Sequence, residues 1–349
     1  MQAWNGGTAV KLAIGAIWPS FNTLENQMPE SAGFTTSGMT AYIIYWLIQL
    51  PILFIPAPKL KYLFLVKSIL VPIVGFATLG WCVAKAGGGG PLLQQEPTVQ
   101  GSAFASAWLL SLTSLIGGYS TVALNIPDFT RYAKKPASQL MQAPTLPLFY
   151  LLTAAFGIFS ASSTLAFTGS VIWSPIDIAA TWDSRAAQFF AAVPWILAQI
   201  SNNVSANSVS AANDLATLFP KYVDITRGQI ICAVIGGWAM VPWKVLADAS
   251  TFLHFISSYA IFLAPLAGIE LADYYIVKRK NYDVPGLYDP HGRYRYSRGC
   301  NWRAIVTLIC TVAPNMPGMI NYLNSSVQIG NISWVCEPCP CSLVVWMWV

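Results

Sequence analysis

Charged side chains are too scarce in this chain to cover the surface of a water-soluble fold. Asp, Glu, Lys and Arg make up 9% of its 349 residues, whereas a soluble domain typically carries about 25%. Hydrophobic residues make up 55%, which excludes a disordered chain, because such chains are poor in apolar residues. The remaining class is an integral membrane protein, for which the bilayer is the solvent of most of the surface.

Long apolar segments recur along the chain at the length that a bilayer requires, about 20 residues for a spanning helix. Nine stretches qualify: 3–20, 40–57, 62–85, 103–126, 145–173, 188–216, 228–244, 251–277 and 301–323. Prolines and paired glycines interrupt several of them, which membrane helices tolerate where neighbours or water satisfy the freed backbone groups. The sequence therefore predicts an all-α membrane bundle of about nine transmembrane helices.

Basic residues divide unequally between the two alternating sets of loops. One set holds fourteen: Lys59, Lys61, Arg131, Lys134, Lys135, Lys221, Arg227, Lys278, Arg279, Lys280, Arg293, Arg295, Arg298 and Arg303. The opposite set holds three: Lys85, Arg185 and Lys244. Cytoplasmic loops carry the excess of Lys and Arg, so loop 278–303 is predicted to be cytoplasmic. Because no basic stripe with interleaved aromatics accompanies the net charge of +5, no nucleic-acid partner is expected.

Polar residues inside a bilayer are costly and usually mark a pathway, and residues 198–214 are unusually rich in them. Five polar side chains recur there at helical spacing: Gln199, Asn203, Asn207, Ser210 and Asp214. Such a stripe either joins helices by hydrogen bonds across the bundle or lines a solvated cavity. The density of polar residues favours the cavity.

The fourth segment contains the pair Gly117 and Gly118, followed by Tyr119. Paired glycines can unwind a helix near the midplane, as in the broken helices of many secondary transporters. They can equally allow close helix packing. The ring of Tyr119 is suited to stacking on a planar solute, although packing is the alternative.

Three further ionisable residues have two interpretations each. Lys67 either snorkels to the inner interface or provides a charge in an ion pathway. Asp128 and Arg131, three residues apart, form either a local ion pair or a gate latch.

The cysteine-rich run at 336–341 lacks a fourth ligand, so no metal site is expected.

Several long runs make the chain similar to a known family. They are GAIWPSF (15–21), NIPDFTRYA (125–133), NNVSANSVSAANDLATLFP (202–220), RGQIICAVIGGWAMVPWK (227–244), YAIFLAPLAGIELADYYIVKRKNY (259–282), LYDPHGRY (287–294) and NWRA (301–304). They resemble the nucleobase–cation symporter family, in particular its fungal uracil, uridine and allantoin permease branch.

The resemblance implies a fold of twelve helices with a five-plus-five inverted repeat. Residues 1–323 resemble the family's helices 3 to 11 and are expected to form a single transporter domain, whereas 324–349 form an atypical tail. We therefore expect a member that is shortened at both ends.

The resemblance also implies a substrate site and a cation site. Gln2, Gly118, Tyr119 and Asn207 match substrate-binding positions of the family. For the cation pathway, Ala198 and Ser201 match two positions of sodium-using relatives, but Asn202 replaces their threonine. This departure argues against sodium coupling, and the resemblance to the fungal branch implies coupling to protons.

These observations together predict a secondary active importer of a uracil, uridine or allantoin-like solute, with a co-transported proton and no other cofactor. No enzymatic activity is expected. The expected partners are this solute and the lipid bilayer, most simply that of the plasma membrane. The oligomeric state stays open, and an inert or regulatory fragment of such a permease is the alternative.

Overall fold

The computed structural model describes most of the chain and confirms an all-α fold. The described residues are 1–96, 100–101, 104–105, 107–108, 111, 124–130, 133–239, 241–245, 249–287, 289, 291–297 and 299–323. Within them the only pairing of β type is an isolated bridge between Ser297 and Cys300. The chain divides into two compact units, residues 1–96 with 128–247 and residues 97–127 with 248–349.

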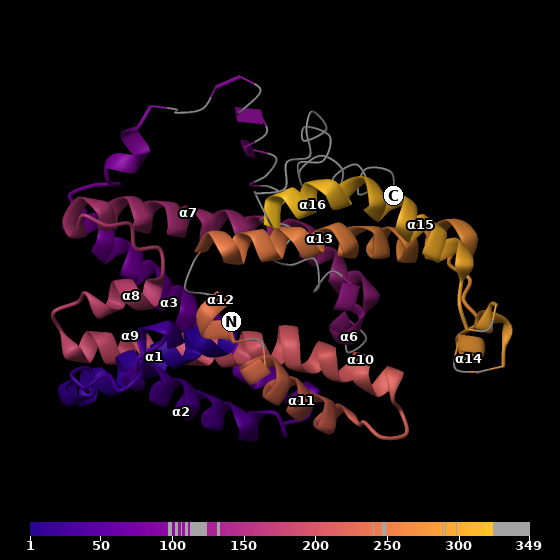
Figure 1. Ribbon diagram of the computed structural model, residues 1–349, viewed down its shortest axis with the longest axis horizontal. Helices are drawn as coiled ribbons and strands as arrows, with labels where there is room; N and C mark the ends of the chain where they lie inside the picture. Colours follow the sequence, from indigo (N-terminus) through magenta and orange to yellow (C-terminus); the bar gives the residue numbers. More distant parts are fainter. Residues whose placement is uncertain are drawn as a thin grey trace. The chain divides into compact units, whose positions relative to one another are not determined.

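The long helices overlap the predicted apolar segments (Figure 1), apart from segment 103–126, most of which lies outside the described residues. The first unit contains α1 (Gln2–Ile17), α2 (Thr36–Ile52), α3 (Lys61–Ala86), α7 (Gln142–Thr168), α8 (Pro175–Ala180), α9 (Arg185–Asn202), α10 (Ser210–Leu218), α11 (Ile225–Val234) and α12 (Pro242–Val245). The second contains α13 (Ala249–Ala272), α14 (Val284–Leu287), α15 (Trp302–Val312) and α16 (Met316–Leu323). The short α6 (Pro127–Thr130) lies at the boundary between the units.

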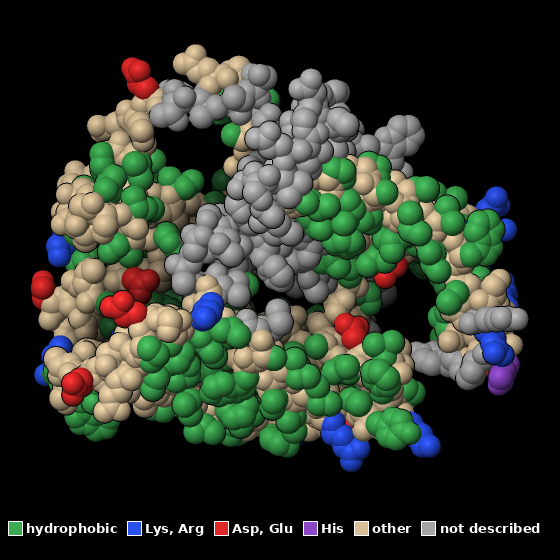
Figure 2. Space-filling model, in the orientation of Figure 1, with side chains coloured by type: hydrophobic (Ala, Val, Ile, Leu, Met, Phe, Trp, Pro, Cys, Tyr) green, Lys and Arg blue, Asp and Glu red, His purple; other side chains and the backbone are tan. Residues whose placement is uncertain are grey.

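Two helices of the described residues are continuous, long and apolar enough to cross a bilayer. They span Lys61–Ala86 and Ala137–Thr168. On the first, Leu65, Ile69, Ile73 and Phe76 are all more than half exposed. Their spacing puts them on one helical face, which suits contact with lipid. Figure 2 shows hydrophobic side chains over much of the visible surface. The number of transmembrane helices, nine by sequence, stays a prediction, as does the single domain over 1–323.

Helix α1 lies close to α2 because two glycines of α1 face α2. A Cβ atom on Gly6 would lie 2.0 Å from the ring of Tyr45, and one on Gly7 would lie 2.8 Å from the Cα of Tyr42. Small residues of this kind let membrane helices approach closely. At the other end, the Arg185 guanidinium donates to the carbonyls of Ala16 (2.9 Å) and Ile17 (2.7 Å), which satisfies free acceptors at the helix C-terminus.

Helix α2 also holds α11 and the π-helical turn η7 (Ile235–Ala239) that continues it. The Tyr42 hydroxyl donates to the Gly237 carbonyl (2.6 Å), and the Trp46 indole donates to the Ala233 carbonyl (3.1 Å). Tyr42 is fully buried, with its ring 5.5 Å from that of Trp4 and 5.4 Å from that of Trp238. These aromatic contacts belong to the hydrophobic core of the first unit.

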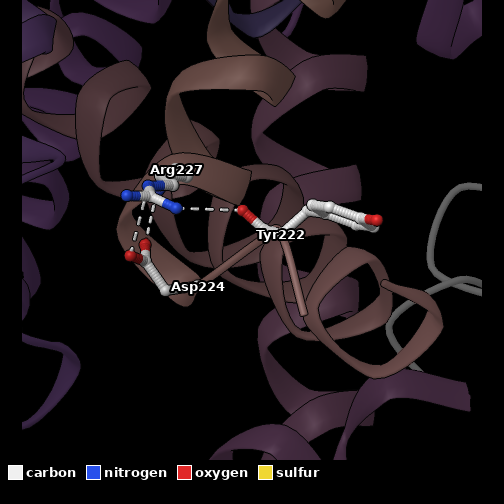
Figure 3. A network of polar contacts seen from close by, with 3 residues as sticks. All are labelled: Tyr222, Asp224 and Arg227. Carbon is white, nitrogen blue, oxygen red and sulfur yellow. Dashed lines mark hydrogen bonds and ion pairs between the residues drawn. The ribbon is translucent and has the colours of Figure 1, made fainter. Parts of the chain in front are cut away.

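The loop between α10 and α11 is organised by local polar contacts (Figure 3). The Asp224 carboxylate accepts from the Arg227 backbone N–H (2.8 Å) and so caps α11. The Arg227 side chain returns to the Asp224 carboxylate and donates to the Tyr222 carbonyl (3.1 Å).

In the second unit, α13 packs against α15 and α16 and ends in the π-helical turn η8 (Asp273–Val277). The segment that follows η8 is ordered by stacked tyrosines. The Tyr282 ring stacks on Tyr274 (5.8 Å between centroids) and on Tyr294 (5.9 Å). Its hydroxyl donates to the Asp273 carboxylate. This hydrogen bond and the surrounding burial raise the pKa of Tyr282, burial being the larger cause.

Candidate functional site

The polar stripe predicted from the sequence coincides with a change of helix type. Helices α9 and α10 are joined without a break by the π-helical turn η6, Asn203–Val209. In a π turn each backbone hydrogen bond joins residues five apart, and such turns are frequent at functional sites. It widens the helix where amide and hydroxyl side chains are densest, which re-aims those side chains relative to a regular α-helix.

A relay of three amide side chains runs from the interior to this turn. Asn207 donates its amide N–H to the Asn203 side-chain oxygen (2.8 Å), and Asn203 donates to the Gln49 side-chain oxygen (2.9 Å). Gln49 lies on α2 and is 1% exposed, whereas Asn207 is exposed. The buried end fixes the orientation of the exposed amide. Among the described residues, the amide oxygen of Asn207 keeps its capacity to accept a hydrogen bond.

A second polar contact joins α3 to the end of α9. The Lys67 ammonium donates to the Asn202 side-chain oxygen, and both residues are half-buried. Neither α7 nor α9, the two long helices that pack against α3, carries an Asp or Glu. The only ion pair among the described residues joins Arg227 to Asp224. The Lys67 ammonium is therefore bonded to a neutral amide. This contact lies in the stretch of α9 where the sequence predicted a cation pathway.

Of the other two predicted cation-pathway residues on α9, Ala198 lies about one helical turn before Asn202, and Ser201 directly precedes it. Ala198 is 3% exposed and Ser201 is fully buried. The Ser201 hydroxyl donates to the Leu197 carbonyl (2.6 Å), which leaves its oxygen able to accept. The side-chain oxygen of Gln199 is buried and has no hydrogen-bond partner within the described part of the chain. This oxygen therefore keeps its capacity to accept a hydrogen bond from a water or a polar ligand.

The remaining predicted residues lie on other helices or outside the described residues. Gln2 is the first residue of α1 and is half-buried. Asp128 lies in α6 and is half-buried. Gly118, Tyr119 and Arg131 lie outside the described residues, so their predicted roles stay predictions.

The sequence reasoning missed Gln49. Its signal was visible in the sequence, because it is a lone amide within the apolar run YWLIQLPILF of residues 45–54. A single such residue predicts nothing about its partner, which here lies 154 positions away. The stripe residue Asn203 was identified, but its role as the middle member of a relay was not.

Comparison with known proteins gives consistent matches. The sequence model of a family described as permeases for cytosine and purines, uracil, thiamine and allantoin matches residues 1–336. An uncharacterized permease of Schizosaccharomyces pombe is 39% identical over 332 residues, covering 94% of this chain and 59% of the relative. The uracil permease of Saccharomyces cerevisiae is 34% identical over 339 residues, covering 92% and 53%. The chain thus spans little more than half the length of these relatives.

One solved structure shares the fold. It is the nucleobase-cation-symport-1 family transporter Mhp1, in a closed conformation with bromovinylhydantoin bound. The TM-score is 0.66 at 22% sequence identity, and the match covers 100% of this chain and 77% of that one.

Proposed function

Because the chain belongs to the family of permeases for cytosine and purines, uracil, thiamine and allantoin, we propose that it carries a planar nucleobase, nucleoside or ureide by secondary active transport. Proteins of this family are membrane transporters, and the chain is accordingly an integral membrane protein. The plasma membrane is the proposed location, and a purely non-enzymatic role is part of the proposal.

The observation that carries the proposal is the amide relay at η6. Nucleobases and ureides present amide-like donors and acceptors in one plane, and an asparagine side chain offers both kinds of group. The buried Gln49 and the half-buried Asn203 hold the Asn207 amide in one orientation. A solute whose donor does not meet the fixed acceptor leaves a polar group unpaired, which costs about 1–3 kcal/mol. Discrimination between similar solutes follows from that cost.

Tyr119, Gly118 and Gln2 complete the proposed substrate site on the strength of the family resemblance. Tyr119 would stack on the solute, and base–aromatic stacking contributes about 1–3 kcal/mol. Tyr119→Phe is then expected to keep most of the binding, whereas Tyr119→Ala loses it. Equal damage by both changes would show that the hydroxyl matters more than the ring.

The coupling ion is proposed to be a proton. Asn202 stands where sodium-using relatives have a threonine, and it accepts a hydrogen bond from the Lys67 ammonium. In this proposal the ammonium takes the place of a bound metal cation beside Ala198 and Ser201. Loss of its proton would remove the charge and weaken the hydrogen bond to Asn202, which gives the site two states. Asp128 and Arg131 are proposed to form a gate outside this site.

Two measurements test transport and binding separately. Radiolabelled uracil, uridine, allantoin and cytosine are offered to a host that lacks its own carriers for them, with and without the chain. In parallel, the thermal stability of the purified chain is followed with each solute, because a ligand that binds the native state raises it. Saturable uptake and stabilisation by one solute are expected. If none of these solutes stabilises the purified chain, the proposed substrate class is wrong.

The coupling is tested by replacing sodium with choline and by varying the external pH. Uptake is expected to be insensitive to the first change and to rise on acidification. Lys67→Gln, which keeps a donor but cannot titrate, is expected to remove the pH dependence. A requirement for sodium in the unaltered chain would overturn the proton proposal while leaving the substrate proposal intact.

A further inference from the structure

The second unit contains a cavity of 740 Å³ that the proposed transport site does not use. Its walls are formed by the end of α13, the turn η8, α15 and the loop residues that precede α15. Apolar residues such as Pro265, Ile269 and Ala304 line most of it, and Lys278 and Arg303 provide cationic side chains. We propose that this cavity binds an anionic phospholipid, with an acyl chain between α13 and α15 and the phosphate beside Lys278 and Arg303.

Within the described part of the chain, the two cationic groups have no carboxylate partner. Of the described residues, none forms an ion pair with Lys278 or Arg303. The Lys278 ammonium lies 4.9 Å from the ring centroid of Tyr294, and the Arg303 guanidinium lies 5.7 Å from that of Trp302. Rings at these distances orient the cations without neutralising them. Asp273 also lines the cavity, but its carboxylate accepts from the Tyr282 hydroxyl. The cavity therefore keeps a net positive charge.

The α15 wall adds backbone donors to the same place. Asn301 precedes the 11-residue helix α15 and makes no side-chain capping bond to its first turn. Free N–H groups at a helix N-terminus favour a phosphate. Asn301, Trp302 and Arg303 all line the cavity, so these donors and the guanidinium are available to one anionic group.

The apolar surroundings favour a lipid over a soluble anion. Trp302 is 59% exposed and Val277 is 65% exposed, and both line the cavity. Tryptophan and tyrosine prefer the membrane–water interface, where Trp302 and Tyr296 would lie beside a headgroup. The predicted cytoplasmic position of loop 278–303 brings the site to the leaflet that is rich in anionic lipids. A phosphate ion alone would leave the apolar walls of a 740 Å³ cavity uncovered.

The test uses the chain reconstituted in nanodiscs with phosphatidylcholine and a small share of phosphatidylserine, followed by native mass spectrometry of the lipids that stay bound. We expect selective retention of phosphatidylserine that decreases with salt, because the contact is ionic. Soluble glycerophosphoserine in excess should not displace it. Displacement by this headgroup would assign the site to a soluble anion and overturn the lipid proposal, as would retention without lipid selectivity.

Substitutions that remove charge or fill the cavity test where the phospholipid binds. The double change Lys278→Gln and Arg303→Gln should weaken phosphatidylserine retention about 30-fold, because each base near an anionic surface contributes about a fivefold change in affinity. The matched control, Lys59→Gln with Lys61→Gln, removes the same charge from another predicted cytoplasmic loop and should preserve retention. Ala304→Trp, which fills the cavity and keeps both cations, should also abolish it. Equal effects of the two double variants would show a general surface attraction and refute the cavity site.

Discussion

Two π-helical turns in the first unit use the same backbone irregularity in opposite ways. The turn η6 (Asn203–Val209) carries amides and hydroxyls and presents Asn207 at an exposed position. The turn η7 (Ile235–Ala239) is apolar, and α2 holds it through a hydrogen bond from Tyr42 to Gly237 and holds the preceding end of α11 through one from Trp46 to Ala233. A widened turn must find partners for displaced backbone groups. At η7 and the end of α11 before it, the partners are fixed aromatic donors. At η6 the polar side chains are the ones proposed to bind the solute.

The comparison divides the expected effects of mutation into two classes. Changes at the contacts of η7 should lower the free energy of unfolding and affect solute binding little. Changes in the relay at η6 should weaken solute binding and affect folding less.

The largest effect is expected for Tyr42→Ala. The side chain is fully buried among aromatic rings, and removal of a buried aromatic side chain costs about 3–5 kcal/mol of the free energy of unfolding. Unfolding of the purified chain in mixed detergent measures it. Tyr42→Phe keeps the ring and loses only the hydrogen bond to the Gly237 carbonyl, for about 1–2 kcal/mol. An unfolding free energy unchanged by Tyr42→Ala would contradict the assigned role of η7.

Asn203→Leu should have the next largest effect, on solute binding. The change removes the donor to the Gln49 oxygen and the acceptor for Asn207 together. Binding should weaken by about 2–3 kcal/mol, or about 30- to 150-fold, measured with radiolabelled solute. Ser205→Ala is the matched control in the same turn, because that hydroxyl donates to the Ser201 carbonyl (2.8 Å) and lies outside the relay. Equal losses in both variants would mean that η6 acts only through its backbone.

A smaller effect is expected for Trp46→Phe. The variant loses the indole hydrogen bond to the Ala233 carbonyl and keeps an aromatic side chain. The free energy of unfolding should fall by about 1 kcal/mol with unchanged solute affinity. A change in affinity larger than the change in stability would connect η7 to the solute site.

The smallest effect is expected at the loop between α10 and α11. Arg227→Gln breaks an ion pair whose two side chains are 69% and 63% exposed, and exposed pairs contribute about 0–1 kcal/mol. Stability should change by less than about 0.5 kcal/mol, in a salt-dependent way. A loss above 2 kcal/mol would give this loop a structural weight that the geometry does not indicate.

Much of the candidate site was predictable, because helical periodicity shows which residues of one helix lie next to one another on the same face. The stripe with Asn203 and Asn207 follows from spacing alone, and the relay contact between these two residues joins positions four apart. Their partners on other helices were not predictable in this way. Gln49 and Lys67 are single polar residues in apolar segments, and nothing in their spacing assigns them to Asn203 or Asn202.

The sequence by itself determined the membrane environment, the helical class and the position of the polar stripe. The reason is that the small number of charged residues and the length of the apolar segments both reflect the solvent that surrounds the chain. Tertiary structure decided where the helices depart from regular geometry and which polar groups meet. A π turn is kept only where neighbours satisfy its backbone, as Tyr42 does at η7 and Trp46 does at the end of α11 before it. The contacts from Gln49 to Asn203 and from Lys67 to Asn202 depend on how α2, α3 and α9 pack, and packing is a property of several segments together.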